Sequence, residues 1–207
     1  DRPAKPNYSS PVVLTAAGRT QLVLTGCDLV TSLDPTTGQT FWEFPGATTE
    51  CVTTTVTDGQ RIFTSGGYPK NHVSAVFADG TGKLAWENNA RTYVPSMLLH
   101  DNALFAVLDA GIAMCWDSAS GQELWKGRLG GTFSSSPVLA NGTIYATSEE
   151  GTTFVFEASR DKFTQVASSK LGDHTFASPT ICGSRIYQRI ATSENGRRQE
   201  FAVCIGS

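Results

Sequence analysis

The sequence predicts an all-β protein made of repeated four-stranded antiparallel units, and three observations lead to this prediction. A proline beside a short apolar run recurs at Pro11, Pro95, Pro137 and Pro179, with spacings of 84, 42 and 42 residues. A turn that begins with Asp and ends with Gly is followed by Trp in three places. Short runs rich in Val, Ile and Thr lie between such turns, which favours strands over helices. A fixed period indicates one structural unit repeated along the chain.

Each unit can be divided into strands. In the first unit we expect them at 10–14, 21–25, 29–33 and 40–44. The next two units repeat the pattern at 52–56, 61–65, 73–77 and 84–87, and at 95–99, 103–108, 112–116 and 123–126. The fourth unit lacks the Gly and Trp of its turn, and the fifth ends after three strands, which we expect at 178–181, 185–190 and 200–205. The predicted domain, 1–207, thus contains units at about 9–51, 52–92, 93–132, 133–175 and 176–207. Such units are typical of the blades of a β-propeller.

Three side-chain types recur at equivalent positions of the first three units: Asp34, Asp79 and Asp117 open the turn, Gly38, Gly82 and Gly121 close it, and Trp42, Trp86 and Trp125 follow four residues later. An Asp carboxylate at this place can accept hydrogen bonds from backbone N–H groups two or three residues on, and Gly can adopt a positive φ. A large ring at one position of each outer strand suits a wedge between diverging sheets. We therefore expect a structural role for all nine residues.

The motifs D-P-T-T-G-Q-T-F-W and D-S-A-S-G-Q-E-L-W resemble the repeat of the quinoprotein-type (pyrroloquinoline-quinone-type) propellers, from about Ser9 to Ile205. That family includes quinone-dependent alcohol and glucose dehydrogenases and the non-enzymatic propeller scaffold of the bacterial outer-membrane assembly machine. The resemblance implies a ring of seven or eight blades, of which this chain would supply a C-terminal portion; a closed ring of five is the alternative. It also implies a bacterial protein that is exported, for example to the periplasm.

Composition argues against several classes of partner. The net charge of −3 and pI near 5.6 provide no field that would attract nucleic acid or an anionic membrane. The apolar runs, such as 103–108, fall far short of the roughly 20 residues that a membrane-spanning helix needs. Five cysteines, an odd number, are expected to be buried thiols, with one disulfide as the alternative.

No catalytic set can be assembled from the sequence. His72, His100 and His174 are far apart and are expected in or near solvated loops or turns. The quinone enzymes of the family hold Ca²⁺ through carboxylate and amide oxygens and often carry a disulfide between adjacent cysteines, but this chain has no Cys-Cys pair and none of the ligands can be matched. We therefore expect no cofactor and leave catalytic and cofactor-binding residues unassigned; pyrroloquinoline quinone with Ca²⁺ is the alternative.

The geometry of a propeller indicates which loops form the candidate binding face. The loops between the second and third strands of each blade should emerge on one face together with the linkers between blades; they are 26–28, 65–72, 108–111, 148–151 and 193–198. The longest, 65–72, departs most from a tight turn, and long loops on rigid scaffolds often carry function. The candidate residues on this face are Asp28, Tyr68, Lys70, Asp109, Glu149 and Glu150.

These observations favour a non-catalytic propeller that presents this face to a protein, such as a basic or aromatic peptide, or to another ligand. Upstream blades or a second copy of the chain would cover the open sheet edges. One alternative is a quinone-dependent alcohol or sugar dehydrogenase, or a fragment of one. Another is a glycan-binding or glycan-processing propeller, in which Asp28 would pair with Asp109 or Glu149 across the channel.

Overall fold

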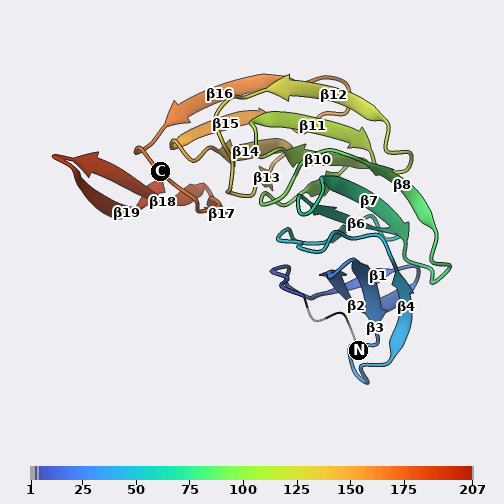
Figure 1. Cartoon of the computed structure of the whole chain (residues 1–207). Helices are drawn as coiled ribbons and strands as arrows, with labels where there is room; N and C mark the ends of the chain where they lie inside the picture. Colours follow the sequence, from blue (N-terminus) through green and yellow to red (C-terminus); the bar gives the residue numbers. More distant parts are fainter. Residues whose placement is uncertain (1–2, 4, 207) are drawn as a thin grey trace.

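Alternating runs of Val, Thr, Ala and aromatic residues pair as antiparallel strands throughout the described chain, residues 3 and 5–206 of a computed structural model. Five sheets follow one another along an open arc (Figure 1), which confirms the predicted propeller fold class. The alternative of a closed five-bladed ring is wrong, because the first and fifth sheets lie at opposite ends of the arc. Within the described residues there is no helix, and so none that could cross a membrane. The predicted domain's residues 1, 2, 4 and 207 lie outside this description.

Each sheet is a meander of consecutive strands. The first contains β1 (Val12–Ala16), β2 (Arg19–Gly26), β3 (Leu29–Leu33) and β4 (Thr40–Phe44), and the second β5 (Val56–Thr57), β6 (Arg61–Gly66), β7 (His72–Phe77) and β8 (Leu84–Asn88). The third contains β9 (Leu98–His100), β10 (Ala103–Val107), β11 (Ile112–Asp117) and β12 (Glu123–Arg128), and the fourth β13 (Val138–Ala140), β14 (Thr143–Thr147), β15 (Thr152–Glu157) and β16 (Gln165–Lys170). The fifth has only β17 (Thr180–Cys182), β18 (Arg185–Glu194) and β19 (Arg197–Ile205).

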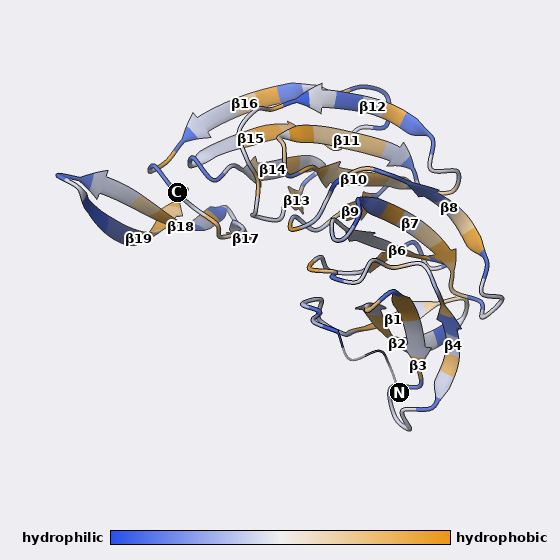
Figure 2. Ribbon diagram, in the orientation of Figure 1, coloured by the Kyte–Doolittle hydropathy of each residue, from blue (hydrophilic) through white to orange (hydrophobic). Residues whose placement is uncertain are grey.

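Several strand predictions differ from the structure in extent, most of all those for β5, β18 and β19. The strand predicted at 52–56 is reduced to β5, Val56–Thr57. Before β5 the Thr54 N–H donates to Ser96 Oγ at 3.0 Å, outside its own sheet. Strands β18 and β19, in contrast, are longer than predicted and form a projecting hairpin. Figure 2 shows that the tip of this hairpin is hydrophilic, whereas much of β7 and β10 is hydrophobic.

The core lies between consecutive sheets. Strand β10 is buried on both faces, so neighbouring residues pack in opposite directions: Leu104 joins the cluster shared with the second sheet, and Phe105 joins the cluster shared with the fourth. A third cluster joins the first and second sheets through residues such as Val23 and Ile62. Burial therefore stabilises each sheet only together with its neighbours, as expected for a repeat architecture.

Each repeated Trp packs against the turn of the following sheet. The Trp86 indole N–H donates to the Ser118 carbonyl at 2.8 Å, and its ring lies where a side chain at Gly121 would stand. Trp125 donates in the same way to the Ser159 carbonyl at 2.8 Å. Trp42 differs, since its indole N–H donates to Gln21 Oε1 at 3.0 Å within its own sheet.

Gln21 carries the contact between the first two sheets instead. Its side chain is fully buried, and its amide nitrogen donates to the carbonyls of Ala16 at 2.9 Å and of Ala78, in the second sheet, at 3.1 Å. Its amide oxygen accepts from Trp42 and from the Ser32 hydroxyl. All the polar atoms of this side chain are therefore satisfied, as burial requires.

The turns before the Trp residues are closed by their Asp side chains. One carboxylate oxygen of Asp34 accepts hydrogen bonds from the N–H groups of Thr36 and Thr37 at 2.7 and 3.2 Å. The same arrangement holds at Asp117, and Asp79 accepts from the Thr81 N–H. Gly38 and Gly121 end two of these turns with φ values of 74° and 72°, a conformation that disfavours a side chain.

The recurring Pro motif marks a chain of hydrogen bonds between the inner ends of the sheets. The Thr54 N–H donates to the Ser96 hydroxyl oxygen at 3.0 Å. In the same way, the Ser96 N–H donates to Ser136 at 3.0 Å, and the Ser136 N–H donates to Ser178 at 2.8 Å. We call these four residues the inner ladder. The inner ladder thus links the second to the third, the third to the fourth and the fourth to the fifth sheet. The first two of these contacts also have a Trp hydrogen bond from the outermost strand, through Trp86 and Trp125.

The contact between the fourth and fifth sheets is looser. A cavity of about 170 Å³ lies between them, lined by residues that include Tyr145, Val155 and Ile186. Strand β16 is exposed along its whole length.

The expectation that the cysteines are buried is wrong for two of them. Cys27, Cys51 and Cys115 are buried, whereas Cys182 and Cys204 are exposed on the three-stranded fifth sheet.

We predict that Gly121→Ala destabilises the protein more than Gly38→Ala. Both substitutions place a side chain at nearly the same positive φ, which costs about 1 kcal/mol. A Cβ at Gly38 has nothing within 4 Å, whereas one at Gly121 overlaps the Trp86 ring, so overpacking should add about 1–3 kcal/mol. Urea unfolding of the two variants measures the difference. Equal losses of unfolding free energy in the two variants would show that the Trp86 ring does not pack against this turn.

A second prediction concerns acid stability at the contact between the third and fourth sheets. Arg160 donates to the Asp117 carboxylate at 2.8 Å and thereby lowers the pKa of Asp117 to about 2. Because this pKa is below the unfolded value of about 3.9, the stabilisation is present above pH 4 and is lost as the pH falls towards 2.

The variant Arg160→Gln should therefore show a shallower loss of unfolding free energy than the wild type between pH 4 and pH 2. Urea unfolding at several pH values measures this slope. Lys162→Gln removes an equal charge from the same exposed turn and serves as the control. If both variants keep the wild-type slope, Asp117 does not depend on Arg160.

Candidate binding face

One face of the arc is formed by the turns that join the second and third strands of each sheet, together with the linkers from one sheet to the next. The linker after β4 is bonded to the first sheet: the Cys27 N–H donates to the Thr49 carbonyl at 2.7 Å, and the Asp28 N–H donates to the Thr48 carbonyl at 3.2 Å. The same linker forms an isolated bridge to the second sheet between Glu50 and Tyr68. This face is therefore a hydrogen-bonded surface that joins neighbouring sheets.

The acidic candidate residues on this face each accept hydrogen bonds from a linker. Asp28 accepts from the Thr49 hydroxyl at 2.7 Å, and Asp109 accepts from the Tyr93 N–H at 2.8 Å. Glu149 and Glu150 accept from the linker after β12, through the Ser134 hydroxyl and the Thr132 N–H respectively. These contacts give the four carboxylates a structural use, and they involve three different linkers of the arc.

Asp28 has a second partner in the N-terminal segment. Lys5 Nζ lies 2.8 Å from its carboxylate and lowers the pKa of Asp28. Nearby, the Asn7 side chain accepts from the Cys51 N–H at 3.0 Å and donates to the Thr25 carbonyl at 2.8 Å. The described part of this segment thus lies on the face in the manner of a linker, and Tyr8 at its end is 63% exposed.

Tyr68 and Lys70 project from the longest loop. The Tyr68 side chain is 54% exposed, and Lys70 is exposed beside it. The backbone beneath them is held, because the Glu50 N–H donates to the Tyr68 carbonyl at 3.3 Å and the Tyr93 side chain covers Gly67. The Tyr93 hydroxyl donates to Glu50 at 2.9 Å, and burial together with this carboxylate raises the pKa of Tyr93. Tyr68 is therefore an exposed aromatic side chain on a fixed backbone.

The three histidines lie in different parts of the arc. The expectation of a solvated loop residue is wrong for His72, which is buried at the start of β7 with its Nε2 atom 2.9 Å from Glu87 on the outer strand β8. His100 ends β9, on a different sheet. Within residues 3 and 5–206, no three His, Cys, Asp or Glu side chains are grouped so that they could share a metal ion.

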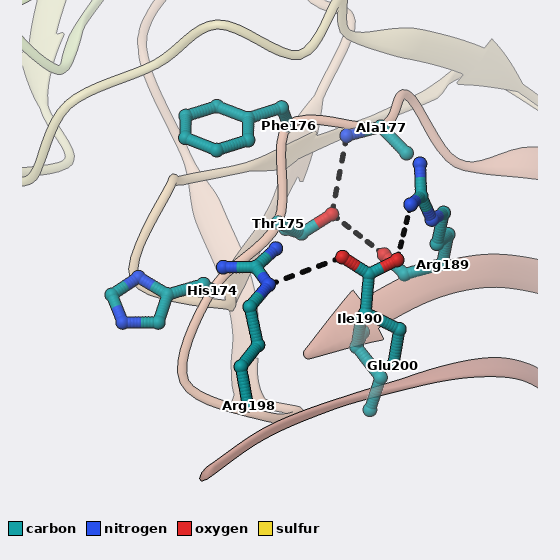
Figure 3. Close-up of a pocket in the computed structure, with 8 residues that line it drawn as sticks. All are labelled: His174, Thr175, Phe176, Ala177, Arg189, Ile190, Arg198 and Glu200. Atoms are coloured by element: carbon teal, nitrogen blue, oxygen red, sulfur yellow. Dashed lines mark hydrogen bonds and ion pairs between the residues drawn. The ribbon is translucent and has the colours of Figure 1, made fainter. Parts of the chain in front are cut away.

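A pocket at the end of this face was missed by the sequence analysis. It has a volume of about 380 Å³ and lies between the linker that carries His174 and Phe176 and the projecting hairpin that carries Arg189, Arg198 and Glu200 (Figure 3). Only the loop 193–198 pointed to this region. Arg189 and Glu200 fall inside expected strands, so their meeting depended on the register in which β18 pairs with β19, which the sequence pattern alone did not specify.

Solved structures with the same architecture share little sequence with the chain. They include BamB from Moraxella catarrhalis (TM-score 0.67, 14% identity, 89% of this chain and 56% of that one). A chain of the mitotic checkpoint complex matches with a TM-score of 0.65 and 11% identity, over 82% of this chain and 55% of that one. A quinohemoprotein alcohol dehydrogenase from Pseudomonas putida matches with a TM-score of 0.62 and 12% identity, over 98% of this chain and 39% of that one. These likenesses support the propeller fold, and the chain spans about half or less of each matched chain.

Comparison at the level of sequence identifies the family. No curated protein matches the sequence. A family model described as outer membrane protein assembly factor BamB does match, over residues 3–98 and 69–163. These overlapping segments cover well over half of the chain and include all three repeated Trp residues. The chain therefore belongs to the BamB family of quinoprotein-type propellers.

Proposed function

We propose that the protein is a non-catalytic scaffold of the bacterial cell envelope, exported to the periplasm, that binds a protein partner through the loop face. The family description, an outer membrane protein assembly factor, supports a role in protein assembly. The use of Asp28, Asp109 and Glu149 as acceptors for the linkers supports a face built for shape and rigidity rather than for acid–base chemistry.

The observation that carries the proposal is the exposure of Tyr68 on a fixed backbone. Aromatic side chains are enriched at the centres of protein interfaces because they bury a large area at a low cost in side-chain entropy. The Tyr68 backbone is already held by Glu50, and its loop is held by Tyr93, so a partner would not have to order the loop. Lys70 beside it would favour an acidic group on that partner.

A quinone-dependent dehydrogenase is the alternative that needs a separate test. Such an enzyme would require carboxylate and amide oxygen ligands for Ca²⁺ beside the quinone. We propose that the protein works without quinone. Absorbance spectra of the native protein, before and after addition of pyrroloquinoline quinone with Ca²⁺, test this directly.

We predict that a photo-crosslinking amino acid at position 68 captures a specific envelope protein in the source organism. Tyr68→Ser should then weaken binding of that purified partner by about tenfold or more, the effect typical of an interface hot spot. Mass spectrometry identifies the partner, and titration calorimetry measures the loss.

Position 166 provides the matched control, because Val166 is also 54% exposed but lies on the outer strand β16. A crosslinker placed there should not capture the same protein. Identical products from both positions, or a stoichiometric quinone chromophore in the native protein, would overturn the scaffold proposal.

A further inference from the structure

The projecting hairpin of the fifth sheet differs from its counterparts in the other sheets. Strands β18 and β19 are 10 and 9 residues long, whereas β10 and β14 have 5 each. Its turn, Asn195-Gly196, has φ values of 51° and 73°, as in the tight turns that continue the twist of a hairpin. The hairpin extends well beyond the rest of the fifth sheet (Figure 1). It therefore adds a rigid wall to one side of the pocket.

The opposite wall is fixed to the hairpin by hydrogen bonds. The Thr175 hydroxyl donates to the Arg189 carbonyl at 2.6 Å and accepts from the Ala177 N–H at 3.2 Å. His174 and Ala191 exchange backbone hydrogen bonds of 3.1 and 2.8 Å. Phe176 lies between Thr175 and Ala177, whose carbonyl accepts from Gln188 Nε2 on the hairpin at 2.7 Å, yet 60% of its surface is exposed. An aromatic side chain on a backbone held in this way offers apolar surface to a ligand without a cost in ordering the linker.

The pocket carries a net positive charge in a fixed arrangement. Arg189 and Arg198 both contact the single carboxylate of Glu200, the latter through its Nε atom at 3.1 Å. These hydrogen bonds lower the pKa of Glu200, so the carboxylate stays ionised and keeps both guanidinium groups in place. Figure 3 shows Glu200 between the two arginines, with the Phe176 ring on the same side of the pocket as Arg198 and His174.

Each guanidinium has more donors than Glu200 uses. An arginine presents five N–H groups, and a planar fork of two suits a carboxylate. The arginine side chains are 70% and 48% exposed, so their remaining N–H groups can be reached by a ligand. An acidic group beside an aromatic or aliphatic one would match both the arginines of the hairpin and Phe176 of the linker, which line the same pocket.

We infer that this pocket binds an extended acidic segment of a protein partner, with an Asp or Glu carboxylate at Arg189 and Arg198 and an adjacent aromatic side chain against Phe176. This inference extends the proposed scaffold function by assigning it a second contact and a ligand class. A protein segment fits better than an anionic membrane, since lipid recognition generally uses clusters of four or more basic residues, whereas this pocket has two arginines that share one glutamate.

The test measures fluorescence anisotropy with a labelled peptide of alternating Phe and Asp. Saturable binding is expected, and replacement of every Asp by Asn, or of every Phe by Ser, should weaken it by about tenfold, as for loss of a charged hydrogen bond or a buried aromatic contact. Arg198→Gln and Phe176→Ser should each weaken binding of the Phe-Asp peptide by a similar factor.

Arg197→Gln is the matched control, because it removes the same charge from the same hairpin at a residue that does not line the pocket. It should leave the affinity within about twofold. Circular dichroism and thermal unfolding show whether each variant is folded. A peptide that binds equally well with Asn in place of Asp, or equal losses for the variants at 197 and 198, would overturn the inference.

Two further outcomes also decide against it. One is the absence of saturable binding up to about 1 mM peptide. The other is binding to phosphatidylglycerol vesicles, but not to the peptide, that depends on Arg198. Neither outcome bears on the crosslink from position 68, so failure of the pocket and failure of the scaffold proposal can be distinguished.

Discussion

The contact between consecutive sheets is the interaction on which the rest of this structure depends. A four-stranded sheet with both faces apolar, as around Leu104 and Phe105, cannot be stable until a neighbour covers each face. The inner ladder joins the sheets at one end of this contact, and Trp86 or Trp125 joins them at the other. Two attachments at opposite ends of a face fix both the separation and the rotation of the next sheet.

The loop face is a consequence of the same arrangement. Since each sheet has a defined position relative to the next, a linker can form hydrogen bonds to both, as the linker that contains Glu50 does with Asp28 and Tyr68. The linkers need acceptors along their paths, and the acidic residues of the turns provide them. This explains how a face can carry several carboxylates that are used to hold its linkers, while the aromatic side chain of Tyr68 stays exposed.

The fold could be predicted from the sequence because its strongest signals are local. An Asp at the start of a turn, a Gly at its end and a Trp four residues later define one hairpin, and their recurrence defines the repeat. Contacts between residues of different sheets could not be predicted in this way. The role of Gln21 follows from its proximity to Ala78 in space, and the role of Ser136 follows from its neighbours Ser96 and Ser178. The sequence marks these residues as polar but does not indicate their partners.

At the candidate site, too, the positions of the loops could be predicted from the sequence, whereas their contacts could not. The loops that carry Asp109 and Tyr68 could be located from the repeat, but whether a side chain there is bound or exposed depends on the path of the linker that crosses it. Of the pocket at Phe176, only the loop 193–198 could be located from the sequence, because the pocket arises where the repeat is broken. The fourth unit has lost its Trp, a cavity remains between Tyr145 and Ile186, and the fifth sheet has gained a longer hairpin. A repeat sequence is informative about the positions that obey the repeat, whereas a specific ligand is best recognised where one unit departs from it, since identical units would offer the same contact several times. The departure in the fifth unit is therefore the part of this arc best suited to confer specificity.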